Sequence, residues 1–335
     1  MKRRLLTILT ALLLTGSAFA ANIEVLPTMQ SKTNVQDRVW VGTFQIVWND
    51  FMDKIAFNQI KFPTGTPVSV NELNKQAFTV DELSEKCYYK YFGNVTRSTK
   101  KTIARAIKRK FNETSDILDQ IDLTPGKDKF FVYAMLKKDF KFKAPFDKLG
   151  KSKFRNTEAE YFGIQPNSPK DLDDTVEVLF YNNPSDFAVR LEAQGKDEVY
   201  LYKTANTKTF NYIYADMLKK KNAFGGNRSF DEADLLKVPN LKFFVEKVFE
   251  EIGGHRVKGT NIVIEKAMET VKFEMDNTGV KLKSEAAIIA KMTALLPSAE
   301  PRYFYFDDTF VLFLKEKGKD KPYFALRVYD ISKYQ

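Results

Sequence analysis

Runs of strand-forming residues dominate the chain after residue 129 and constrain its fold more than any other feature. The first run, at 130–136, is an almost continuous apolar sequence, as in strands that are covered on both faces. Further runs lie at 176–181, 187–192, 198–202, 241–245, 270–275, 304–314 and 323–328. Helical patterns at 207–221 and 230–237 separate some of them. The sequence therefore predicts an α+β protein in which strands follow helices.

The segment before residue 98 has a more helical pattern. Apolar residues recur at three- and four-residue spacing, which predicts a core helix with one apolar stripe: Trp40, Phe44, Val47, Trp48, Phe51 and Ile55. Residues 22–37 show no apolar period and predict an extended leader that need not pack. Residues 80–93, which end at a glycine, predict a short helical piece.

A helix with a basic face is predicted to begin at Ser98 or Thr99. Ile103, Ile107 and Phe111 lie four residues apart and would form its buried stripe. Basic side chains point elsewhere and form a candidate polyanion-binding face: Lys100, Lys101, Arg105, Lys108 and Arg109. Two interpretations stay open. The face binds a polyanion or an anionic surface, or it is an ordinary solvated helix face.

The first 20 residues predict export. Lys2, Arg3 and Arg4 precede an apolar run at 5–14 and small residues up to Ala21, which is typical of a secretory signal peptide (1–20) cleaved after Ala20. No later apolar run is long enough to cross a membrane, so we expect a secreted or periplasmic protein that is not transmembrane. Cleavage removes three positive charges from the net charge of +10. The remaining excess of basic residues is too small to indicate nucleic-acid binding.

The sequence offers little support for an enzyme. The single cysteine, Cys87, cannot form an intramolecular disulfide, and the single histidine, His255, cannot build a multi-histidine metal site. The glycines do not form a phosphate-binding loop, and the acidic cluster at 171–174 lacks the spacing of a calcium loop. We expect Cys87 to be buried and inert, and we expect no catalytic residue, metal or cofactor.

Several segments, taken in order, resemble the serpin family. They comprise 111–118, the strand and Pro-Phe sequence at 133–147, the Val-Pro strand at 238–243, the strand and glycine at 272–280, and the closing strands at 306–313 and 324–328. The resemblance covers roughly residues 95–335. Residues 21–97 are shorter than the helical half of an ordinary serpin and lack its Ser-Pro-x-Ser motif, and Phe140 or Phe142 replaces a usual tryptophan.

The resemblance implies a single domain over 21–335, with a shortened helical part (21–97) and a sheet-rich part (98–335). It also implies a monomeric inhibitor of serine or cysteine proteases. In serpins, the protease cleaves an exposed loop, here 279–305, and the loop then inserts as an extra strand of the large sheet. A non-inhibitory extracellular binding protein is the alternative, and the target protease stays open.

Insertion of the loop as a strand requires small or apolar side chains at alternate positions. From Gly279 the inward set of this predicted hinge is Val280, Leu282, Ser284 and Ala286, followed by Ile288 and Ala290. Leu282 is larger than the alanine expected there, which would slow insertion. The cleavage region is predicted within Thr293, Ala294, Leu295, Leu296, Pro297 and Ser298, with the bonds after Ala294 and Leu295 favoured, because a bond before Pro297 has a tertiary amide nitrogen as its leaving group.

Overall fold

A seven-stranded sheet carries most of the core in the computed structural model, which describes residues 23–126, 129–281 and 301–335. Its strand order is β1-β2-β17-β16-β10-β9-β8, and every pair is antiparallel except β1–β2. The strands are β1 (Glu24–Leu26), β2 (Arg38–Val41), β8 (Val176–Asn183), β9 (Asp186–Glu192), β10 (Asp197–Lys203), β16 (Phe310–Glu316) and β17 (Phe324–Val328). Every residue of β17 is buried, so this sheet is covered on both faces at its centre.

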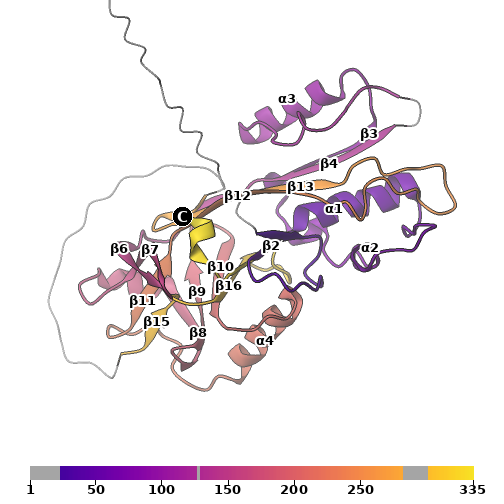
Figure 1. The fold of residues 1–335 in the computed structure, drawn as a ribbon. Coiled ribbons are helices and arrows are strands. Elements are labelled where there is room, and N and C mark those ends of the chain that lie inside the picture. Colours follow the sequence, from indigo (N-terminus) through magenta and orange to yellow (C-terminus); the bar gives the residue numbers. More distant parts are fainter. Residues whose placement is uncertain (1–22, 127–128, 282–300) are drawn as a thin grey trace, which may run out of the picture.

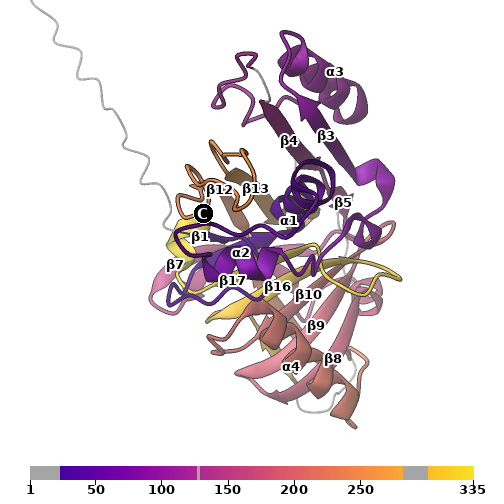
Figure 2. The same cartoon turned by 90° about the vertical axis from the view of Figure 1, so that its right-hand side faces the viewer.

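Helix α4 (Phe210–Ala223) packs on this sheet. Its first turn is capped by the Thr209 hydroxyl, which accepts a hydrogen bond from the Tyr212 N–H. The Phe210 and Tyr214 rings meet Phe313 of β16 edge to face. Figures 1 and 2 show α4 at the end of the molecule opposite α3.

A four-stranded sheet of order β15-β11-β7-β6 lies beside the first. It contains β6 (Asp147–Phe154), β7 (Thr157–Ile164), β11 (Leu235–Pro239) and β15 (Tyr303–Tyr305). β11 pairs antiparallel with β7 and parallel with β15. The chain that returns from residues 282–300 therefore enters this sheet.

The remaining strands form a sheet of order β12-β13-β14-β5 and a separate pair, β3–β4. Their bounds are β3 (Tyr88–Asn94), β4 (Phe130–Leu136), β5 (Asp139–Lys141), β12 (Leu241–Val248), β13 (Met268–Asp276) and β14 (Gly279–Lys281). Only Lys137 and Lys138 separate β4 from β5 along the chain. β4 and β5 therefore form one nearly continuous extended segment, and its second part, β5, pairs with β14.

Helices cover both faces of the β3–β4 pair. α1 (Gly42–Phe51), continued by a π-helical turn (Met52–Ala56), packs on the inner face, and the short α2 (Val68–Leu73) lies beside it. α3 (Thr99–Phe111) lies along the outer face (Figure 1) and ends at Asn112, whose φ is 57°. A small second core joins α3 to β4: Val95, Ile103, Ile107, Phe111, Leu118, Phe131 and Tyr133. Short 3₁₀ turns occur at Val80–Glu82, Glu85–Cys87, Lys170–Thr175 and Ile331–Tyr334.

The structure confirms the basic helix, the helix near 207–221 and the predicted strands, with the run at 304–314 divided into β15 and β16. The division arises because the two halves pair in different sheets. The structure confirms the core helix from Gly42 onward, but Trp40 lies in strand β2, where it pairs with Ala325 of β17.

Four sequence expectations are wrong. Residues 22–37 do pack, since Val25 and Leu26 are buried in β1, which pairs with β2. The helical piece predicted at 80–93 is mostly strand β3, held by its pairing with β4.

The helix predicted at 230–237 is a turn followed by β11, because Asp234 is bound by Arg302 and the next residues pair with β7. Strand β4 is not covered along both faces. Its burial alternates, with Phe131 and Tyr133 buried and Phe130 exposed. Strands β6 and β7 were not predicted, and β6 is an edge strand with exposed lysines. None of the described helices is both long and apolar enough to cross a membrane.

Candidate functional site

An opening separates β4 from β13. Among the described residues, β4 pairs only with β3, and β13 pairs with β14 only through Glu274, Met275 and Asp276. The edge of β4 and the 268–273 edge of β13 therefore face each other, and no strand of the described residues lies between them. A cavity of about 940 Å³ lies there and is lined by both strands. Backbone groups along such edges are free to pair with an added strand.

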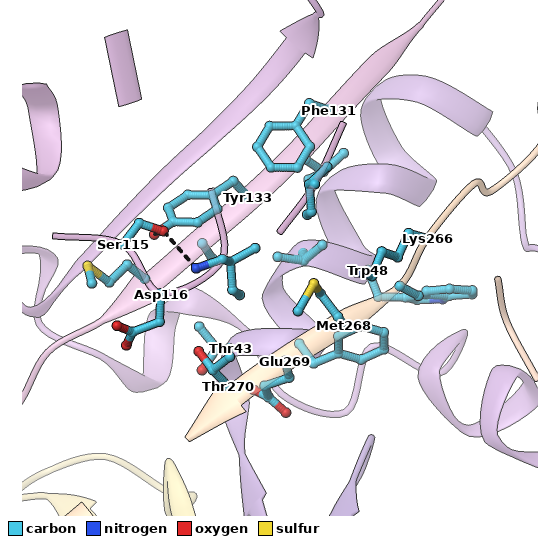
Figure 3. A pocket seen from close by; sticks show the side chains of 18 of the residues that line it. Thr43, Trp48, Ser115, Asp116, Phe131, Tyr133, Lys266, Met268, Glu269 and Thr270 are labelled. Carbon is cyan, nitrogen blue, oxygen red and sulfur yellow. Dashed lines mark hydrogen bonds between the residues drawn. The ribbon is translucent and has the colours of Figure 1, made fainter. Parts of the chain in front are cut away.

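The cavity has an apolar floor and a polar rim (Figure 3). Helix α1 provides the floor through Phe44, Val47, Trp48 and Phe51. The segments 113–117 and 261–266 close it from other sides, and the Tyr133 hydroxyl ties β4 to the first of them by donating to Ser115 Oγ at 3.2 Å. The cavity is therefore bounded by segments far apart in sequence.

Strand β14 already lies in one end of the opening. It pairs antiparallel with β13 on one side, Val280 opposite Met275, and with β5 on the other, Val280 opposite Phe140. Val280 is fully buried and lines the cavity. The chain enters this position through Gly279, which approaches the β5 backbone so closely that only a residue without a Cβ atom fits.

A buried ion-pair cluster anchors the β4–β5 junction to the seven-stranded sheet. The Lys138 ammonium pairs with Asp197 of β10 at 2.8 Å and with Glu316 of β16, and Ser84 also donates to Glu316. Burial alone would lower the pKa of Lys138, but its two carboxylate partners raise that pKa above its usual value. The cluster fixes the edge of the opening in place, because the Lys138 ammonium joins the β4–β5 junction to both β10 and β16.

Glu269 of β13 is a second buried charge-bearing group at the cavity. It shares the inward face of β13 with Val271, Phe273 and Met275, and it lies near the first turn of α1. Burial raises its pKa to about 8, although the Thr43 hydroxyl and the Phe44 N–H partly offset that rise. Neither carboxylate oxygen has a partner in good hydrogen-bond geometry among the described residues. The sequence analysis missed Glu269, although it breaks an apolar alternation.

Only part of the predicted hinge and loop lies within the described residues. Gly279 and Val280 occupy β14 as just described. Leu282, Ser284 and Ala286, and the predicted cleavage region from Thr293 to Ser298, lie outside the described residues. The end of the predicted loop, from Tyr303, forms β15. The cleavage site and the course of the loop stay predictions.

The predicted polyanion-binding face lies on α3, away from the cavity floor. All five of its basic residues are exposed, and Lys100 pairs with Asp119. The helix has no acidic residue of its own. Polyanion binding stays a prediction.

Other reactive side chains have local structural partners. Cys87 is buried, and burial raises the pKa of its thiol, so it is a poor nucleophile. The His255 ring stacks on Phe62, with ring centroids 4.8 Å apart. Burial raises the pKa of Asp173 to about 6, and within the described chain no three metal-binding side chains form a group that could hold an ion.

Comparisons with known proteins give resemblances at low sequence identity only. No protein-family model matches the sequence, and no curated protein matches it either. Serpin48 of the insect Tenebrio molitor is 14% identical with a TM-score of 0.49, over 88% of this chain and 92% of that chain. Thyroxine-binding globulin with thyroxine is 12% identical (TM-score 0.46; 89% and 94% covered), and human kallistatin is 11% identical (0.44; 86% and 95%). These proteins are what the chain resembles; its own helices and sheets make it an α+β protein.

Proposed function

We propose that the protein is an exported protease inhibitor that acts by inserting its own cleaved loop between β4 and β13. The observation that supports this most is the position of β14. It begins a strand within the opening, with a partner on each side, and the chain beyond Lys281 continues toward the predicted cleavage region. The resemblance to serpins points to the same mechanism.

The register of β14 defines which residues would fill the opening. Lys281 lies opposite Asp139 and Glu274, and continuation of this antiparallel pairing would bring residue 290 opposite Phe130. Residues 282–290 would thus lie along the free edges of β4 and β13. Because Val280 is buried, the even-numbered residues would face α1. Ser284 would then lie beside Val271, and Ala286 beside Glu269.

Insertion would trap a protease only if the loop inserts faster than water hydrolyses the acyl-enzyme. The catalytic serine or cysteine of the protease attacks the loop carbonyl, and the amine side of the peptide leaves, so the loop is bound to the protease as an acyl-enzyme. If the loop inserts before water hydrolyses that ester or thioester, the protease is carried with it and is distorted. If insertion is slow, the protease escapes and the protein is merely a substrate.

One feature favours the second function, a non-inhibitory extracellular binding protein. In the register above, Leu282 would lie between Phe273 and the buried Lys138, and a leucine is larger than the alanine expected at this inward position. Overpacking of this kind costs about 1–3 kcal/mol and would slow insertion. The two functions therefore differ in the speed of insertion and not in the fold.

The test is covalent trapping. The mature protein is incubated with elastase-like and chymotrypsin-like serine proteases and with a papain-like cysteine protease, whose pockets accept Ala294 or Leu295. An inhibitor gives a complex that survives denaturing electrophoresis. The control is the same protease with its nucleophile replaced by alanine, which cannot form the acyl bond. Cleavage of the loop without any covalent complex would support the binding-protein function instead.

A further inference from the structure

Six acidic side chains are buried in the described residues, and five of them have a basic partner. Asp37 pairs with Lys333, Asp50 with Lys54 and Lys90, Glu198 with Arg190 and Lys315, Asp234 with Arg302, and Glu316 with Lys138. Glu269 is the exception within the described chain, and its exposed fraction is only 4%. A buried carboxyl group without a cation is costly unless something else compensates for it.

The lysines that line the cavity do not compensate for Glu269. Lys129, Lys137 and Lys138 pair with other carboxylates, and Lys266 donates to the Gln120 carbonyl oxygen at 3.1 Å. Lys272 is exposed and lies on the opposite face of β13. Glu269 therefore lies in the cavity wall, and none of the described lysines of the cavity pairs with it.

The cavity itself has the character of a ligand site. Its volume of about 940 Å³ is within the range of small-molecule pockets, and its floor is aromatic and aliphatic, with Trp48 and Phe44 among the floor residues. Both Glu269 oxygens are covered from solvent, but the side chain lines the cavity, so a ligand lying there is within reach of the carboxyl group after a change of rotamer.

We propose that this cavity binds an amphipathic primary amine, with the apolar body on α1 and the ammonium group paired with Glu269. The apolar body would gain from burial against the floor. The ammonium group would supply the cation that the other buried carboxylates obtain from lysine or arginine. This goes beyond protease inhibition, and it does not depend on it, because the residues assigned to the amine are Glu269 of β13 and the apolar side chains of α1.

The experiment uses two probes of equal chain length, 1-aminododecane and 1-dodecanol, both below their aggregation limits. Each is titrated calorimetrically into the uncleaved mature protein at pH 8. We expect the amine to bind at least about tenfold more tightly than the alcohol. Titrations in two buffers of different ionisation enthalpy should also show proton release with the amine and none with the alcohol, because Glu269 must ionise to pair with the ammonium group.

Two variants locate the effect. Glu269→Gln should remove the tenfold preference and the proton release, while the affinity for the alcohol changes little. Asp116→Asn is the matched control, because Asp116 is an exposed carboxylate at the cavity rim, and it should keep both. Equal binding of the two probes by the natural protein, absence of binding by either, or a preference that persists in Glu269→Gln would overturn the proposal. The first two results need no variant to fold.

Discussion

A Cβ atom on residue 279 would lie 2.3 Å from the carbonyl oxygen of Phe140, so Gly279 and Phe140 are in contact that only glycine allows. This contact fixes the point at which the chain turns from β13 into the opening. Replacing Gly279 with alanine should therefore displace β14 from β5 and destabilise the protein by about 1–3 kcal/mol. Thermal melting measures the effect. Gly225→Ala is the control, because a Cβ atom there would have no neighbour within 4 Å; an equal loss in both variants would contradict this role.

The raised pKa of Glu269 predicts a pH dependence of stability. Below its usual pKa of 4.5 the carboxyl group is protonated in both the folded and the unfolded protein, so it contributes no slope. Between 4.5 and about 8 only the unfolded protein ionises, and the free energy of unfolding falls as the pH rises, by up to about 1.4 kcal/mol for each pH unit. Above about pH 8 this contribution becomes constant.

Glu269→Gln should abolish that slope, since glutamine does not titrate. Melting temperatures of the variant and the natural protein should diverge from pH 5 to pH 8, with the variant the more stable at pH 8. Asp116→Asn, an exposed carboxylate, should follow the natural protein. A constant difference between Glu269→Gln and the natural protein over this range would show that Glu269 is not protonated in the fold.

The basic face of α3 should tolerate reversal of its charge. The triple variant Lys101→Glu, Arg105→Glu, Lys108→Glu keeps the buried stripe of α3, so its melting temperature should stay within a few degrees of the natural protein, while retention on a sulfated-polysaccharide column should be lost. Ile107→Ala is the packing control and should cost about 2–5 kcal/mol, because Ile107 is fully buried. Unchanged retention of the triple variant would exclude polyanion binding by this face.

The sequence predicted the elements whose pattern is local and missed those that depend on partners. The stripe of Ile103, Ile107 and Phe111 identifies α3 without further information, since helical periodicity is encoded within one segment. Strand β3 was predicted as helical because its pairing with β4, distant in sequence, decides its structure. The alternation from Val280 was visible, but the free edges of β4 and β13 were not. Lys138 and Glu269 could not be identified either, because the sequence does not show which charges are buried.

The register of β14 predicts that the same substitution has different effects at two neighbouring residues. Ser284→Arg would carry a side chain much larger than serine beneath the sheet, so it should block insertion and reduce the fraction of protease trapped on a denaturing gel. Glu285→Arg exchanges one charged side chain for another on the opposite face of the inserted strand, beside Met135 and Thr270, and should leave that fraction nearly unchanged. Leu282→Ala should increase trapping, because it removes the oversized inward side chain. Equal losses in Ser284→Arg and Glu285→Arg would contradict the proposed register.

Thermal melting before and after one cut between Thr293 and Ser298 tests loop insertion most directly. Insertion of 282–290 would form new ladder hydrogen bonds with β4 and β13, each worth about 1 kcal/mol, and would fill the cavity. We therefore expect the melting temperature to rise by at least about 10 °C after the cut, given about 2–4 °C for each kcal/mol in a large domain. An unchanged or lower melting temperature after a confirmed single cut would contradict insertion and, with it, the inhibitory mechanism.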